Sequence, residues 1–331
     1  MLDVAQSEAN ITSTLASARA GNRDAFSALA EPHRLELQAH CYRMLGSAQD
    51  AEDLVQETLL RAWRRLDTYA GRAPFRAWLY KIATNACLDV LDRRPKRTLP
   101  VAKVEASDPG EPLAPPISEP IWLEPYPDEL LAASDSNPEA RYDARESISL
   151  AFLTALQVLP PRQRAIVILR DVLDWRAREV AESLDTTVSA VNSALHRART
   201  TLAKHYQTRD VEGIKSAPAD DALSTLLDRY VRAWERAEID TLISLLTEEV
   251  TFPMPPSPSW YQGRPAVRAF ISANILDGDA RGRWRLLPTR ANGRPAFAWY
   301  KRDPSRAVYN AFAIQVLTVD GNLIADITTF A

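Results

Sequence analysis

The chain has 331 residues, a net charge of −3, 46% apolar residues and 25% charged residues. That length predicts two or three domains, and the composition excludes a mostly disordered chain or a coiled-coil rod. Two cysteines, without a Cys/His cluster, exclude a disulfide framework and a structural zinc site. The chain has neither a signal-peptide pattern nor an apolar run of ~18 residues, so we expect a cytoplasmic protein without membrane contact.

Charge is distributed unevenly along the chain. Residues 57–97 hold ten Lys and Arg against four Asp and Glu, whereas residues 100–147 hold three against eleven. The basic block predicts a surface for polyanions. The acidic block predicts a segment that avoids or imitates them.

Residues 1–95 are predicted to be helical. Apolar residues at helical spacing from Ala51 to Leu66 predict one helix, with Asp50 as its N-cap. The opposite face carries a polar row that either faces solvent or binds a partner: Asp53, Gln56, Glu57, Leu60 and Arg64.

A second helix is predicted from Pro74 to Arg94, ending before Pro95. Cations and aromatic rings alternate along it, a combination that suits single-stranded DNA, although burial in the core is the alternative for Trp78. These mixed positions are Arg76, Trp78, Tyr80, Lys81, Asn85, Asp89 and Arg93.

Residues 96–138 are Pro-rich, acidic and without periodicity, which predicts an extended linker. Its aromatic patch at 121–131 is unusual for a spacer, and we expect this patch to dock on a partner surface that the sequence does not specify.

Residues 139–207 are predicted to be helical and to end in a helix-turn-helix. Asp185 suits a left-handed turn position, and Thr187 is placed to cap the second helix. The alternative is an ordinary helical hairpin with a solvated polar face. The inward stripe is Val180, Ala181, Leu184, Val188, Val191, Leu195 and Ala198. Residues facing away, suited to a DNA major groove, include Ser189, Ala190, Asn192, Ser193, His196 and Arg197.

After a short linker at 208–220, residues 221–331 are predicted to form an α+β domain, with helices first and then an antiparallel meander of strands. Two helices at 222–235 and 240–246 come first, and the Asp320-Gly321-Asn322 turn joins the last two strands. The β-type runs are 250–254, 283–287, 296–300, 309–319 and 323–330.

This domain contains no histidine, because all four precede it. Asp326 is the one strand carboxylate that we nominate as a base or ligand contact; a solvated edge-strand Asp is the alternative. We assign no catalytic residue, metal site or cofactor. Side chains that either line a ligand pocket or pack in the core are Trp260, Tyr261, Trp284, Arg290, Asn292, Trp299 and Tyr300.

Three segments in order resemble regions two and four of bacterial extracytoplasmic-function (ECF) sigma factors: residues 50–63, 75–89 and 159–202. The aromatic linker patch and a tail resembling the SnoaL-like, NTF2-like fold are typical of the sigma-G (SigX5-type) subgroup. The resemblance implies two all-α domains, a linker and a cone-shaped α+β domain. It also implies a non-enzymatic protein that directs core RNA polymerase to promoters.

The implied partners are promoter DNA and core RNA polymerase, through the β′ clamp helices and the β flap. Residues implied for polymerase are Asp50, Asp53, Gln56, Glu57, Leu60 and Arg64. Residues implied for the minus-ten element are Arg76, Trp78, Tyr80, Lys81, Asn85, Asp89, Arg93 and Arg94. Residues implied for the minus-thirty-five element are Arg162, Thr187, Ser189, Ala190, Asn192, Ser193, His196, Arg197 and Arg199.

The resemblance further implies that the tail regulates the factor, in place of a separate anti-sigma protein. We expect the acidic linker to imitate a nucleic-acid strand in the polymerase cleft. Two rivals remain: a repressor or activator that acts without polymerase, and a bifunctional chain whose tail is an isomerase, a cyclase or a sensor of an unknown small molecule.

Overall fold

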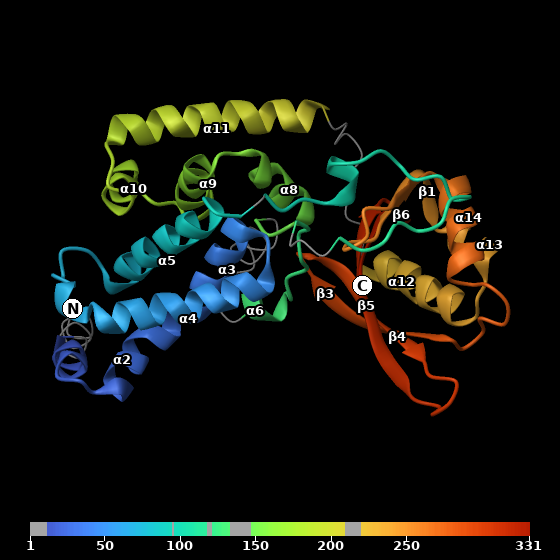
Figure 1. Ribbon diagram of the computed structural model, residues 1–331, viewed down its shortest axis with the longest axis horizontal. Helices are drawn as coiled ribbons and strands as arrows, with labels where there is room; N and C mark the ends of the chain where they lie inside the picture. The colour runs from blue at the N-terminus through green and yellow to red at the C-terminus, as the bar shows by residue number, and fades with distance from the viewer. Residues whose placement is uncertain (1–11, 95, 118–120, 133–146, 209–219) are drawn as a thin grey trace. The chain divides into compact units, whose positions relative to one another are not determined.

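The computed structural model describes residues 12–94, 96–117, 121–132, 147–208 and 220–331. The chain forms two compact units (Figure 1). Within the described residues, unit 1 takes the chain up to 94, then 129–147 and 156–202, and unit 2 takes 95–128, 148–155 and 203–331. Most of the predicted linker therefore groups with the C-terminal domain.

The first part of unit 1 is the expected helical bundle. Ser47 caps α4, since its hydroxyl accepts the Asp50 N–H at 3.0 Å, so the assignment of Asp50 as N-cap is wrong. Asp50 lies in the first turn and accepts from Arg94 at 2.9 Å. The helices are α2 (Arg23–Ala30), α3 (Arg34–Leu45), α4 (Ala48–Arg64), α5 (Phe75–Leu91) and the short α6 (Glu129–Ala132).

The second part of unit 1 contains the helix-turn-helix. Asp185 has φ 49° and the Thr187 hydroxyl accepts the Ala190 N–H at 3.1 Å, so both turn predictions are confirmed. Val188 is 42% exposed, which corrects its place in the inward stripe. The helices are α9 (Pro161–Val167) with a π-helical turn at Ile168–Val172, α10 (Ala177–Ser183) and α11 (Val188–Thr208); α8 (Leu150–Val158) crosses the boundary between the units.

A buried guanidinium joins the two parts of unit 1. Arg164 on α9 is fully buried and donates to the carbonyl oxygens of Met44 on α3 and of Leu156. Burial lowers its pKa to about 10. Because the carbonyl oxygens replace the water that the cation loses, the two helical parts pack against each other at this residue.

Unit 2 is built on a six-stranded sheet in the order β2-β1-β6-β5-β4-β3. Every neighbouring pair is antiparallel except β1 with β6, a parallel pairing that the predicted meander does not contain. The Gly321 turn between β5 and β6 is confirmed, with φ 55°. The strands are β1 (Leu246–Pro253), β2 (Trp260–Gln262), β3 (Trp284–Ala291), β4 (Arg294–Arg302), β5 (Tyr309–Asp320) and β6 (Leu323–Phe330).

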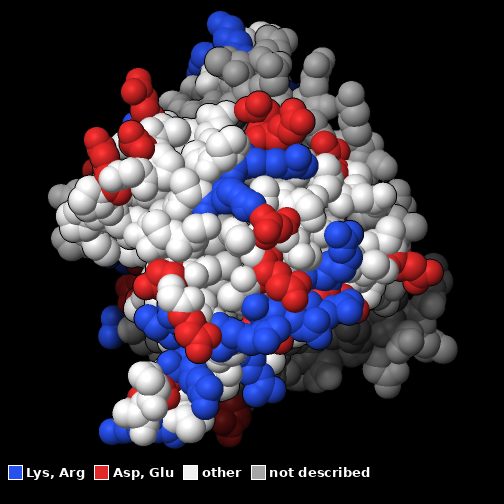
Figure 2. Space-filling model, turned by 90° about the vertical axis from the view of Figure 1, so that its right-hand side faces the viewer, with Lys and Arg blue, Asp and Glu red and all other residues white. Residues whose placement is uncertain are grey.

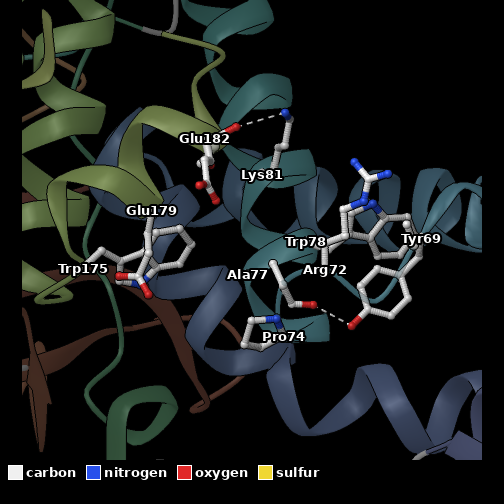
Figure 3. Close-up of a pocket in the computed structure, with 12 residues that line it drawn as sticks. Tyr69, Arg72, Pro74, Ala77, Trp78, Lys81, Trp175, Glu179 and Glu182 are labelled. Atoms are coloured by element: carbon white, nitrogen blue, oxygen red, sulfur yellow. Dashed lines mark hydrogen bonds between the residues drawn. The ribbon is translucent and has the colours of Figure 1, made fainter. Parts of the chain in front are cut away.

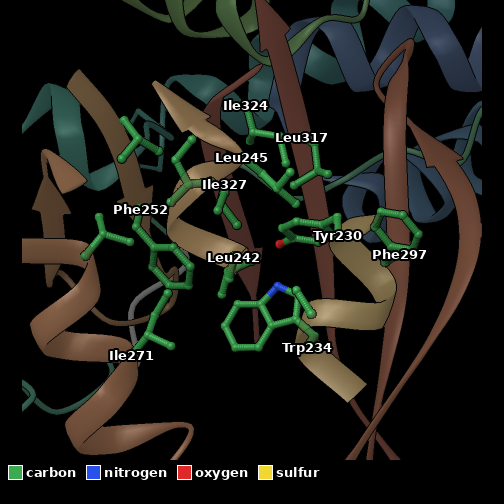
Figure 4. Packing of buried hydrophobic residues seen from close by; sticks show 14 of the residues in the cluster. Tyr230, Trp234, Leu242, Leu245, Phe252, Ile271, Phe297, Leu317, Ile324 and Ile327 are labelled. Atoms are coloured by element: carbon green, nitrogen blue, oxygen red, sulfur yellow. The ribbon is translucent and has the colours of Figure 1, made fainter. Parts of the chain in front are cut away.

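Helices pack on this sheet over one hydrophobic core. Tyr230 and Trp234 project from α12 (Asp220–Glu235) toward Phe297, Leu317 and the β6 side chains (Figure 4). The second predicted helix is α13 (Ile239–Ser244), whereas α14 (Arg264–Asn274) and β2 have no counterpart in the prediction. None of the described helices combines the length and hydropathy needed to cross a membrane.

Charged side chains mix on the surface of this unit. Figure 2 shows Lys and Arg gathered in the lower half of the face that it presents, with Asp and Glu beside them. Arg283 pairs with Asp277 at 2.6 Å. Arg268 pairs with Asp240, an acid that lies in the first turn of α13 and does not cap it. Because many of these cations have acidic neighbours, we do not place a DNA surface on unit 2.

Candidate nucleic-acid and polymerase-binding surfaces

Helix α11 separates a buried stripe from an exposed polar face. Val191, Leu195 and Ala198 are at most 6% exposed and pack inward, as the spacing predicts. Arg199 forms a two-point ion pair with Asp171, with N–O distances of 2.6 and 3.0 Å, and this contact raises its pKa. The exposed positions are Thr187, Ser189, Ala190, Asn192, Ser193, His196 and Arg197, with Arg162 exposed on α9.

The polar row of α4 is exposed along the helix. Asp53, Gln56 and Arg64 face solvent, and Leu60 among them is 41% exposed. Glu57 is half-buried and accepts from Arg61 at 2.7 Å.

Helix α5 keeps much of its predicted DNA face engaged within the protein. Arg76 pairs with Glu36 at 2.6 Å, and its guanidinium lies 4.9 Å from the Tyr80 ring centre. Burial alone would raise the pKa of Glu36, but hydrogen bonds from His33 and Arg76 lower it below its ordinary value. Tyr80 is fully buried, so its ring is not available for stacking on a base in this state.

The C-terminal half of α5 is more open. Asn85 is half-buried, whereas Asp89 is exposed and lies 3.6 Å from Arg61. Arg93 and Arg94 follow the helix and are exposed. The basic character expected for this region therefore remains accessible mainly at its end.

Within unit 1, a cavity of about 290 Å³ separates α5 from the helix-turn-helix (Figure 3). Trp78 is half-buried on its wall, with its ring centre 5.2 Å from that of Tyr69, so it both packs on an aromatic neighbour and keeps part of its ring accessible. Across the cavity lie Trp175 and Glu179. Sequence reasoning missed these two and Tyr69; an aromatic residue just before the helix-turn-helix was the available signal.

One contact closes the cavity on the side of α10. The Lys81 ammonium donates to the Glu182 carbonyl oxygen at 3.2 Å (Figure 3). It also donates to the Asp185 carboxylate at 2.7 Å. The Lys81 ammonium, which we expected to contact DNA, therefore contacts the turn of the helix-turn-helix in this structure.

In unit 2 the aromatic linker patch docks, as expected, and the surface that it docks on is the C-terminal domain. The Asn292 side chain accepts the Tyr126 N–H at 3.0 Å and donates to the Ile148 carbonyl at 2.7 Å. Asp128, 5% exposed, accepts from the Gly293 N–H at 2.8 Å and from Arg290 at 3.3 Å. The β3–β4 turn is therefore a clasp for the end of the linker; sequence reasoning did not single out Asp128.

The earlier part of the linker is held by two tryptophans. Trp122 donates its indole N–H to the Pro256 carbonyl at 2.8 Å. Trp260 donates its indole N–H to the Val104 carbonyl oxygen at 2.9 Å. Arg97, 8% exposed, donates to the Trp122 carbonyl and pairs with Glu124 at 3.0 Å.

Unit 2 also encloses a cavity of about 550 Å³, and the predicted pocket residues divide around it. Trp284 and Trp299 line the cavity. Trp260 and Arg290 instead hold the linker, and Tyr261 stacks on Phe270 at 4.3 Å. These three do not line the cavity: Trp260 and Tyr261 are buried against the linker and α14, and Arg290 is exposed beside Asp128.

Asp326 does not lie on an edge strand, since β6 pairs with both β1 and β5. Its carboxylate accepts from the hydroxyls of Thr251 at 2.5 Å and Thr328 at 2.7 Å, and it does not line the cavity. A carboxylate engaged in this way is a structural acceptor and a poor choice for a general base. No group of potential metal ligands is found among the described residues.

Three family models match the chain in succession. They are sigma-70 region 2 over residues 29–97, sigma-70 region 4 over 149–202, and a SnoaL-like domain over 227–327. The matches coincide with the helical bundle, the helix-turn-helix and the sheet domain.

Similar proteins match most of the chain. The ECF RNA polymerase sigma factor SigG of Mycobacterium tuberculosis is 42% identical over 314 residues, which covers 93% of this chain and 81% of that protein. SigJ of the same organism is 30% identical over 67% of this chain and 62% of its own length. The crystal structure of SigJ superposes with a TM-score of 0.58, at 25% identity, over 94% of this chain and 96% of that one. The chain has the two sigma regions in order and an exposed polar face on α11. Together with these sequence and structural similarities, this shows that the chain belongs to the ECF RNA polymerase sigma factors and carries a SnoaL-like C-terminal domain.

Proposed function

We propose that this sigma factor binds core RNA polymerase and promoter DNA through separate faces of unit 1. The observation that carries the proposal is the exposed face of α11. Asn192 and Arg197 stand there on a rigid helix opposite a buried stripe, which is the arrangement of a recognition helix. Asn can pair with an adenine edge and Arg with guanine or phosphate.

The polymerase surface that we propose is the exposed row of α4. Leu60 supplies apolar area, and Asp53 and Gln56 supply polar contacts one turn earlier. This combination of apolar area and polar side chains on one exposed face suits a protein partner, in agreement with the sigma-70 region 2 match.

We propose that the state described is a self-contained one that opens to engage a promoter. Lys81 pairs with Asp185, Arg76 pairs with Glu36 and Tyr80 is buried, so three proposed minus-ten contacts are engaged inside unit 1. The Lys81 pair is exposed and contributes little, so polymerase or DNA can displace it at small cost.

The C-terminal domain is proposed to regulate this opening through the linker. The clasp at Asn292 and Asp128 fixes the chain segment that joins the two sigma regions. A linker held on unit 2 has less reach between two DNA elements than a free one, so release of the clasp favours the DNA-bound state.

Run-off transcription with core polymerase and a genomic fragment library tests the function. The full chain should direct initiation at discrete start points, and the D53N/L60A variant should lose polymerase binding. E52Q, an exposed change next to the row on the same helix, is the matched control and should behave as the unchanged chain. Absence of polymerase binding by the full chain would overturn the proposal.

A further inference from the structure

The cavity of unit 2 is lined by aromatic rings, is partly open to solvent, and has the volume of a small-molecule site. Its 550 Å³ lies within the range that holds drug-sized ligands. The wall comes from β1, α14, β3, β4 and β5, together with the linker. Ring-bearing residues on this wall are Phe252, Phe270, Trp284, Trp299 and Phe312.

Most polar groups on the wall are already engaged within the protein. Gln315 accepts from the Tyr230 hydroxyl at 2.6 Å and donates to Thr329 at 3.0 Å. The Ser257 hydroxyl donates to the Ala114 carbonyl at 3.0 Å. The Trp299 indole N–H is buried without a partner among the described residues. The wall therefore offers ring surface and few polar groups, which suits a flat, mostly apolar ligand.

Lys301 places a cation on the wall, apart from the Arg283–Asp277 pair. Its ammonium lies 5.7 Å from the Trp284 ring centre, and no carboxylate lies within 4.0 Å of it among the described residues. Arg283 and Asp277 also line the wall and neutralise each other at 2.6 Å. The remaining cation favours a ligand with a single negative charge.

The linker forms part of the same wall. Leu113 and Pro116 line the cavity. The segment is fixed by the Ile117 N–H, which donates to the Pro256 carbonyl at 3.0 Å, and by the Ala114 N–H, which donates to the Ser259 hydroxyl at 3.1 Å. Since the loop that carries Pro256 also lines the cavity, a molecule inside contacts both the linker and its anchor.

We propose that this cavity binds a ring-bearing, mostly apolar small molecule with one anionic group, and that the bound molecule holds the linker on unit 2. The ligand contacts the linker only in its docked position, so it stabilises that position. Its effect on transcription rests on the proposed regulatory role of the linker, whereas binding itself does not.

The test uses the full chain and two fluorescent probes. The first is 1-anilinonaphthalene-8-sulfonate, a ring-bearing monoanion, and the second is the neutral N-phenyl-1-naphthylamine. We expect one saturable site for the anion, and K301Q should weaken that binding about tenfold while the neutral probe binds as before. R302Q, the next position on β4 with its side chain on the other face, is the matched control and should change neither affinity. F312E, which places a carboxylate at an exposed position of the wall, should also weaken binding of the anionic probe.

Hydrogen exchange of residues 107–117 measures the link to the linker. A saturating concentration of the anionic probe should slow hydrogen exchange of residues 107–117 about threefold, because opening of the linker then requires loss of the ligand. Equal affinities for K301Q and R302Q, or no saturable site, would overturn the binding site. Saturable binding with unchanged exchange at 107–117 would overturn the link. Neither readout involves polymerase, so failure here is separate from failure of the proposed function.

Discussion

Asn292 and Tyr126 hold each other by two hydrogen bonds in opposite directions. The Tyr126 N–H donates to the Asn292 side-chain oxygen at 3.0 Å, and the Asn292 N–H donates to the Tyr126 carbonyl at 2.9 Å. Asn292 is fully buried at φ 55°, a backbone conformation that Asn adopts more readily than most residues. One turn residue therefore fixes both the β3–β4 hairpin and the end of the linker.

The variant N292G should release the linker while keeping the turn. Gly adopts the same φ, but the two side-chain hydrogen bonds to Tyr126 and Ile148 are lost, at a cost of about 2 kcal/mol of the free energy of unfolding of unit 2. Hydrogen exchange at residues 121–128 should become faster. A307G is the matched control, since Ala307 has φ 53° in another turn of the same sheet and is exposed. Equal exchange in the two variants would show that Asn292 does not hold the linker.

The variant D185N should increase binding of a single-stranded minus-ten oligonucleotide by unit 1. Asn tolerates the φ of 49° and leaves Lys81 without its carboxylate, so the ammonium is free for phosphate. The pair is exposed, and we expect a gain of about threefold, within the range of surface ion pairs.

A second aspartate provides the control for charge. Asp174 also has a left-handed backbone, at φ 51°, and is exposed, and no ion pair with Lys81 is found for it. D174N removes the same charge without touching the contact between α5 and α10. If both variants bind the oligonucleotide alike, general repulsion explains the gain and the Lys81 contact does not restrain the protein.

Two arginines on α11 should contribute unequally to the salt dependence of binding to duplex DNA. Arg197 is exposed on the proposed groove face, whereas Arg199 already pairs with Asp171. R197Q should lower the slope of log affinity against log salt concentration by about 1, as expected for one lost phosphate contact. R199Q should lower it less, because Arg199 must first leave Asp171. Equal slopes measured by fluorescence anisotropy would contradict this order.

The local features of the fold could be predicted because they depend on neighbours in sequence. The turn at Asp185 and the strand pair around Gly321 follow from backbone preferences at single positions. The N-cap of α4 was misplaced because Ser47 and Asp50 both suit a cap, and only the helix start decides between them. Val188 fits the apolar spacing, yet it lies in the first turn of α11, where no partner helix covers it.

Long-range contacts could not be predicted in this way. The parallel pairing of β1 with β6 joins segments more than seventy residues apart in the sequence, and no local pattern predicts it. The clasp uses backbone groups of Tyr126, which carry no signature in the side-chain sequence. Trp260 and Trp299 look alike in the sequence, but the linker covers the first and the cavity adjoins the second.

Unit 1 should lose stability as the pH falls below about 6.5, because His40 is held neutral. This side chain is fully buried on α3, its Nε2 lies 2.9 Å from the Thr84 hydroxyl oxygen, and Arg43 and Arg76 are nearby cations. Burial, aided by these two cations, lowers the pKa of His40 to about 3. In the unfolded chain the histidine pKa is about 6.5. Between pH 3 and pH 6.5 the unfolded state therefore binds about one proton more than the folded state.

This additional proton on the unfolded state determines how stability changes with pH. The free energy of unfolding should rise with pH across this window, and the His40 contribution at pH 5 should be about 2 kcal/mol lower than at neutral pH. Urea unfolding at several pH values measures it, and H40Q should flatten the dependence between pH 7.5 and 5 even where it lowers stability overall. H196Q changes a histidine exposed on α11 and should keep the original slope. An unchanged slope in H40Q would assign the acid sensitivity to another group.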